Sequence, residues 1–71
     1  MITITVLDRQ TGRPVEGRKV TVHWAWSYAT GYSDRSGSVN LAGGPATGTI
    51  YLSRKNVRKG YLSGNITVYT G

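Results

Sequence analysis

Apolar and polar residues alternate at both ends of the chain. Residues 2–7, ITITVL, and residues 65–70, NITVYT, place Ile or Val at alternate positions. A period of two is the signature of a β-strand that buries one face. The alternation therefore predicts a strand in each segment, with these side chains facing inward: Ile2, Ile4, Val6, Ile66 and Val68.

The longest alternation covers residues 20–28, VTVHWAWSY. If this segment is one strand, a period of two places five side chains on the same face: Val20, Val22, Trp24, Trp26 and Tyr28. We predict that it is the longest strand and that Trp24 belongs to the core. A bulge after Trp24 would instead free Trp26 and Tyr28 toward solvent, so the pattern leaves the burial of Trp26 open.

Segments rich in Gly, Pro and Asp separate the strands, because these residues favour turn conformations. They predict turns or loops at 8–14, 33–38 and 42–48. Shorter alternations predict strands at 39–41 and 49–53. The basic segment that follows, RKNVRKG at 54–60, is predicted to be a loop with at most one helical turn near 56–59.

No window offers ten residues of helical periodicity between these breakers. Short strands with turn signals between them are typical of a β-sandwich or a small barrel. We therefore expect one all-β domain, residues 1–71, with about five to seven short strands that are all or mostly antiparallel.

Several segments together resemble the carboxypeptidase-regulatory-like domain, a transthyretin-type β-sandwich. The matching positions are turn and core residues: Asp8, Thr11, Gly12, Pro14, Val15, Gly17, Val20, Val22, Ser33, Asp34, Gly37, Val39, Leu41, Gly60 and Tyr61. Bacterial Ig-like repeats open with a very similar pattern. The resemblance implies a small Ig-like or transthyretin-like sandwich, and a non-catalytic module that supports, links or binds other molecules.

The charge of the chain is strongly unbalanced. Nine Lys and Arg residues oppose three acids, which gives a formal net charge of +6 over 71 residues. Such a charge favours solubility and attraction to anionic partners. No apolar run approaches the ~20 residues that cross a bilayer, so no membrane insertion is expected, and the compartment stays unknown because no targeting signal is recognisable.

The sequence offers no recognisable catalytic or metal constellation. It contains no cysteine, and its only histidine, His23, has no carboxylate on its own side of the predicted strand. A nucleophile needs a neighbouring base and an orienting group, and a metal needs ligands at suitable spacing. We expect His23 to be a surface residue, the protein not to be an enzyme, and no cofactor or metal.

Two groups of residues are candidates for binding. The first is an aromatic group beyond the core part of the long alternation: Trp26, Tyr28 and Tyr32. Exposed aromatics on a small domain indicate a partner. The second is a run of cations around the apolar Val57, suited to neutralising phosphates: Arg54, Lys55, Arg58 and Lys59. Three further cations would join it only if the first loop lies at the same end of the domain: Arg9, Arg13 and Arg18.

These features lead to three expectations about function. The first is a non-enzymatic accessory or interaction module of a larger surface or viral protein, which binds a protein or a glycan. The alternative is a small basic nucleic-acid-binding β domain that uses the cations of residues 54–59. A third, structural alternative is a homo-oligomer whose copies pair through exposed sheet edges.

Overall fold

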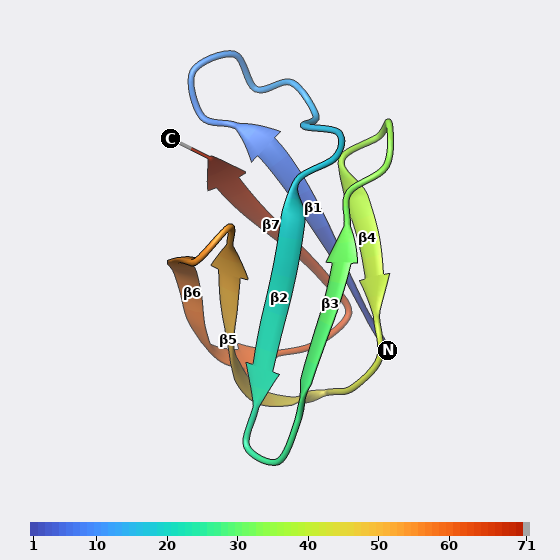
Figure 1. Cartoon of the computed structure of the whole chain (residues 1–71), viewed down its shortest axis with the longest axis vertical. Coiled ribbons are helices and arrows are strands. Elements are labelled where there is room, and N and C mark those ends of the chain that lie inside the picture. The colour runs from blue at the N-terminus through green and yellow to red at the C-terminus, as the bar shows by residue number, and fades with distance from the viewer. Residues whose placement is uncertain (71) are drawn as a thin grey trace.

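The protein is an all-β sandwich of two sheets (Figure 1). The computed structural model describes residues 1–70, and no helix long and apolar enough to cross a membrane occurs within them. The seven strands are β1 (Ile2–Asp8), β2 (Lys19–Trp24), β3 (Tyr28–Tyr32), β4 (Ser38–Leu41), β5 (Ala46–Leu52), β6 (Lys55–Leu62) and β7 (Asn65–Thr70). The predicted fold class and strand number are therefore confirmed.

One sheet has the order β4-β1-β7 and the other the order β3-β2-β5-β6. All neighbouring strands are antiparallel except β1 and β7, which run parallel. The parallel pair joins the first and last strands of the chain, so residues far apart in the sequence hold the smaller sheet together. The larger sheet ends at the free edges of β3 and β6, and the smaller at those of β4 and β7.

The core lies between the two sheets and is built from alternate residues of the strands. Val20 and Val22 of β2 stand opposite Leu52 and Ile50 of β5 and are fully buried. All inward residues predicted for the first and last strands are buried as well, which confirms those two predictions. The buried apolar side chains are Ile2, Ile4, Val6, Val20, Val22, Val39, Leu41, Ile50, Leu52, Leu62, Ile66 and Val68.

Residues 20–28 do not form one long strand, so that prediction is wrong. The backbone N–H of Trp24 donates to the carbonyl of Ser27 at 2.7 Å, and the chain reverses through residues 25–27. Tyr28 then pairs with His23 and begins β3. Figure 1 shows this hairpin at one end of the sandwich and the first loop at the other.

Trp24 is half-buried and packs against the core, as expected for this residue. Its indole Nε1 donates to the carbonyl of Ala42 at 3.2 Å. Gly48, its partner on β5, leaves room for the ring: a Cβ there would lie 2.9 Å from the indole and 2.9 Å from the His23 carbonyl. The indole therefore closes one end of the sandwich.

The basic segment 54–60 is not a loop but most of β6, the longest strand. A two-residue turn connects it to β5, with Ser53 at φ 48° and Arg54 at φ 80°. Two successive positive φ angles match the twist of a tight hairpin, which lets pairing resume at once with Lys55 opposite Leu52. The predicted turn at 42–48 is shorter than expected, because β5 already begins at Ala46.

Candidate functional site

The outer face of the four-stranded sheet carries most of the aromatic side chains of the protein. Because Val20 and Val22 point into the core, the residues between and beside them point outward, and the strand pairing extends this face across the sheet. We call it the tyrosine face, and its outward residues are Lys19, Thr21, His23, Tyr28, Thr30, Tyr32, Thr47, Thr49, Tyr51, Lys59 and Tyr61.

Three rings form a row on the tyrosine face. The centroid of the His23 ring lies 6.0 Å from that of Tyr28 on β3 and 5.0 Å from that of Tyr51 on β5. The His23 and Tyr51 rings meet edge to face at 63°, a favourable arrangement for aromatic rings. The three rings come from three neighbouring strands, so the register of the sheet holds them in place.

A groove of about 600 Å³ runs along this row. Its volume falls within the range of small-molecule sites, roughly 300 to 1,000 Å³. The residues that line it are rings, hydroxyls and two cations, with no acid among them: Lys19, Thr21, His23, Tyr28, Thr30, Tyr51, Ser53 and Arg54. The groove is therefore suited to a flat, anionic ligand.

The two cations of the groove lie at the same end of it. The backbone N–H of Ser53, in the β5–β6 turn, donates to the carbonyl of Lys19 at 3.2 Å. This bond brings Arg54 of the turn beside the start of β2. His23 and Tyr28 lie at the opposite end of the groove, beside the turn between β2 and β3. A ligand in the groove would meet positive charge at one end and aromatic rings at the other.

Two of the three acids have structural roles in turns. Asp8 Oδ1 accepts from the backbone N–H groups of Gln10 and Thr11, at 2.8 and 3.2 Å. Asp34 Oδ1 accepts from the Ser36 hydroxyl at 2.7 Å and from the Ser38 N–H at 3.0 Å. The Ser36 hydroxyl first, and then the Ser38 N–H, hold the pKa of Asp34 below its ordinary value.

The three aromatic residues predicted as a binding group are all exposed. Trp26 is 95% exposed at the tip of the β2–β3 hairpin, which answers the question that the alternation left open. Tyr28 and Tyr32 are 72% and 64% exposed and lie at the two ends of β3 on the tyrosine face, opposite His23 and Lys19 of β2. Of the three, only Tyr28 lines the groove.

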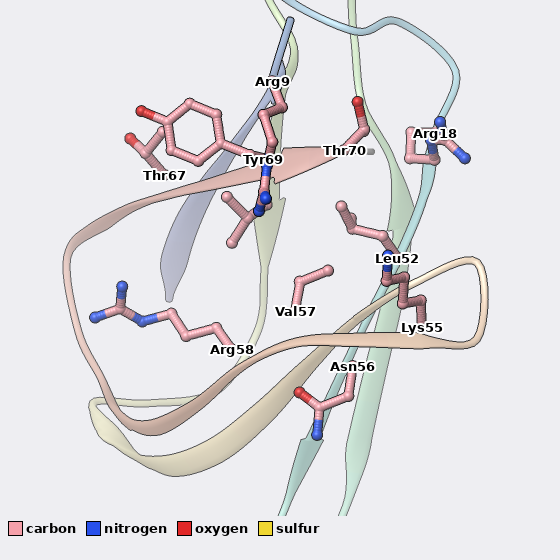
Figure 2. A pocket seen from close by; sticks show the side chains of 11 residues that line it. Arg9, Arg18, Leu52, Lys55, Asn56, Val57, Arg58, Thr67, Tyr69 and Thr70 are labelled. Atoms are coloured by element: carbon pink, nitrogen blue, oxygen red, sulfur yellow. The ribbon is translucent and has the colours of Figure 1, made fainter.

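The four predicted cations divide between two surfaces. Arg54 and Lys59 lie on the side of the tyrosine face, and Arg54 lines its groove. Lys55 and Arg58 line a different cavity, which opens between the edges of β6 and β7 (Figure 2). They are separated because neighbouring strand residues point to opposite sides of a sheet. The run of four is therefore not one patch.

The second cavity also answers the question about the first loop. Arg9 and Arg18 line it together with Lys55 and Arg58, whereas Arg13 does not. In the groove of the tyrosine face, the residues that sequence reasoning did not select for binding are Lys19, Thr21, His23, Thr30, Tyr51 and Ser53. The alternation of residues 49–53 places Tyr51 on the side of the strand opposite Ile50 and Leu52, but a single strand does not show which side chains lie beside it.

Among residues 1–70, no three His, Cys, Asp or Glu side chains gather in a way that could hold a metal ion. No family model matches the chain, and neither a curated protein nor a solved structure matches it. The resemblance to the carboxypeptidase-regulatory-like domain therefore stays a prediction from the sequence pattern.

Proposed function

We propose that the protein is a non-enzymatic binding module whose tyrosine face binds single-stranded nucleic acid. The observation that carries this proposal is the row of Tyr28, His23 and Tyr51 beside Lys19 and Arg54, in a groove lined by no acid. Proteins that bind single strands combine these two elements, namely rings on which bases stack and cations along the backbone path.

In this proposal, each end of the groove contacts a different part of the ligand. Exposed Tyr28 offers its ring to a base at one end, with His23 and Tyr51 continuing the aromatic surface. Lys19 and Arg54 offer positive charge to phosphates at the other end. Stacking contributes about 1 to 3 kcal/mol per base and tolerates any sequence, so we expect little base specificity.

The charge of the groove favours this ligand over the protein or glycan expected first from the sequence. A neutral glycan gains no charge pairing from Lys19 and Arg54, and the groove lining has neither a carboxylate nor an amide side chain to pair with sugar hydroxyls. A nucleic acid uses both the rings and the cations. The net charge of +6 further favours the approach of a polyanion.

The proposal is tested by fluorescence anisotropy with a labelled oligothymidylate and with a duplex of the same length, over a series of salt concentrations. We expect the single strand to bind more tightly, because only its bases are free to stack. The double variant Lys19→Gln/Arg54→Gln should lower the slope of log affinity against log salt by about 1.4, since each phosphate contact to a single strand contributes about 0.7.

The matched control is Arg13→Gln/Arg35→Gln, which removes the same charge from residues outside the groove. It should leave the slope nearly unchanged. The proposal is wrong if both double variants lower the slope equally, or if the unmodified protein retains no oligothymidylate even at low salt.

A further inference from the structure

The cavity between the free edges of β6 and β7 is distinct from the tyrosine face, and we call it the edge cleft. Residues from both strands line it, together with Arg9, Arg18 and Leu52 (Figure 2). The lining includes Lys55, Val57 and Arg58 of β6 and Thr67, Val68 and Tyr69 of β7. Its volume is about 280 Å³, below the usual range for a drug-sized ligand, but the cleft follows two strand edges.

The backbone of β7 has unpaired groups along this cleft. The N–H of Thr3 donates to Gly64 at 3.0 Å and the N–H of Arg9 donates to Thr70 at 3.3 Å, at the two ends of the parallel ladder with β1. In such a ladder every second residue bonds the neighbouring strand. The even-numbered residues of β7 therefore face β1, and the N–H and C=O groups of Thr67 and Tyr69 face the free edge.

The β7 edge lacks the usual protection against strand addition. Residues 65–70, NITVYT, contain no charge and no proline, and β7 has no bulge in its pairing with β1. Exposed edges of this kind pair readily with another extended chain. By contrast, β6 carries Lys55, Arg58 and Lys59 and a register shift opposite Ile50 and Tyr51, which protect its own edge.

The side chains around the cleft indicate the chemistry of such a chain. Its floor is apolar, with Leu52 and Val68 buried and Val57 half-buried against the core. Figure 2 shows the Arg9 guanidinium and the Lys55 ammonium reaching toward the cavity from different walls, with Arg58 along its rim. Four cations and no acid line the cleft, so the lining itself supplies no carboxylate to pair with these cations.

We propose that the edge cleft binds an extended acidic peptide, which adds to β7 as a further strand of the smaller sheet. Main-chain bonds to Thr67 and Tyr69 would hold the peptide. Its alternate side chains would lie on Leu52, Val57 and Val68, and its acidic ones would pair with the cations at the rim. This inference is independent of the function proposed for the tyrosine face, because the two linings share no residue.

A second copy of the chain is a poorer occupant of the same cleft. Pairing two β7 edges would bring together two sets of four cations, Arg9, Arg18, Lys55 and Arg58, on chains that each carry a net charge of +6. Like charges brought together in this way oppose association. An acidic peptide is attracted by the same cations.

The test uses the whole chain, labelled with ¹⁵N, and a short synthetic peptide that alternates Glu and Val. We expect the peptide to shift the amide signals of Thr67 and Tyr69 and to slow their hydrogen exchange, since these amides become hydrogen-bonded. A peptide with Lys in place of Glu should not bind. Thr67→Pro removes one edge N–H, which edge strands tolerate, and should weaken binding about tenfold, whereas Thr67→Val should not.

Charge is tested with Arg9→Gln/Lys55→Gln against Arg13→Gln/Arg35→Gln, which alters no cleft residue. Only the first pair should weaken peptide binding by about tenfold or more. The proposal is overturned if inorganic phosphate produces the same signal shifts and exchange protection. It is equally overturned if the peptide, or an oligothymidylate, shifts signals of the edge cleft without slowing the hydrogen exchange of Thr67 and Tyr69. It is also overturned if the chain dimerises through β7. Tyr28→Thr should leave peptide binding intact, because Tyr28 does not line the edge cleft. The peptide test can therefore fail without affecting the proposal for the tyrosine face.

Discussion

The two sheets present very different outer faces to solvent. The outward positions of the larger sheet hold tyrosines, His23 and cations as well as threonines, as the residue pairs across β3, β2, β5 and β6 show. On the smaller sheet the outward residues are mostly hydroxyl and amide side chains, with one tyrosine and no cation: Thr3, Thr5, Leu7, Ser38, Asn40, Asn65, Thr67 and Tyr69. We call this second surface the threonine face.

The threonine face shows what the fold itself requires of an outward position. Thr is β-branched and polar, so it suits a strand residue that faces water, and Thr3 Oγ1 also donates to Asn40 Oδ1 at 2.7 Å. The same solution was open to the larger sheet, where Thr21 and Thr30 do bond across strands at 3.2 Å. The fold therefore does not require the rings and cations on the outward positions of the larger sheet. Their presence there supports a binding role.

The largest effect is expected from a change in the core that both faces share. Ile50→Ala removes a fully buried side chain of β5 and should lower the free energy of unfolding by about 2 to 5 kcal/mol. Thr5→Val on the threonine face should change it by no more than about 0.5 kcal/mol. Urea unfolding followed by tryptophan fluorescence measures both, and similar losses in the two variants would contradict the assigned inner and outer positions.

A smaller effect is expected when the tyrosine face is made to resemble the threonine face. Tyr28→Thr removes the exposed tyrosine ring of the groove and should weaken oligothymidylate binding by about 1 to 3 kcal/mol. The reverse change, Thr5→Tyr, should add little affinity, because none of the outward strand residues of the threonine face is a cation. Anisotropy titrations compare the two, and unchanged binding by Tyr28→Thr would remove the stacking role.

Two neighbouring residues of β6 offer a finer comparison. Lys59 points to the tyrosine face, whereas Arg58 lines the edge cleft. Lys59→Gln should lower the salt slope of oligothymidylate binding by up to about 0.7, and Arg58→Gln should leave it nearly unchanged. The opposite ranking, from the same salt series, would place the nucleic acid in the cleft.

The smallest effect is expected at low pH, and it depends on Asp34 in the turn between β3 of the larger sheet and β4 of the smaller sheet. The pKa of Asp34 is lowered on folding, so its carboxylate stabilises the fold above the unfolded value of 3.8, and this contribution is lost as pH falls through the lower folded pKa. The melting temperature of Asp34→Asn should therefore fall less at low pH than that of the unmodified protein. An unaltered decline would assign the acid sensitivity to the other carboxyl groups.

Much of the fold could be predicted from the alternation of Ile and Val. It located β1, β4, β5 and β7 because one side of each strand must be apolar to form the core. It did not locate the β2–β3 hairpin, because residues 25–27 contain no Gly, Pro, Asn or Asp and the alternation continues unbroken through them. The β5–β6 turn was missed for a similar reason, since Ser53 and Arg54 hold positive φ without glycine.

The candidate site was predictable only as separate residues. Exposed Tyr28 and Tyr32 and the cations Arg54 and Lys59 were selected from composition and spacing. Their grouping depends on the register between strands, which places His23 beside both Tyr28 and Tyr51 and turns Lys55 away from Arg54. Register is set by the whole core, and a local pattern does not contain it.

We propose that single-stranded nucleic acid binds the tyrosine face and not the threonine face. Titration of the ¹⁵N-labelled chain with an oligothymidylate at low salt tests it most directly. We expect the amide signals of four groove residues to shift, namely Thr21, His23, Thr30 and Tyr51, while those of Thr3, Thr5 and Asn40 stay in place. Shifts of equal size on both faces, or shifts confined to the threonine face, would contradict it.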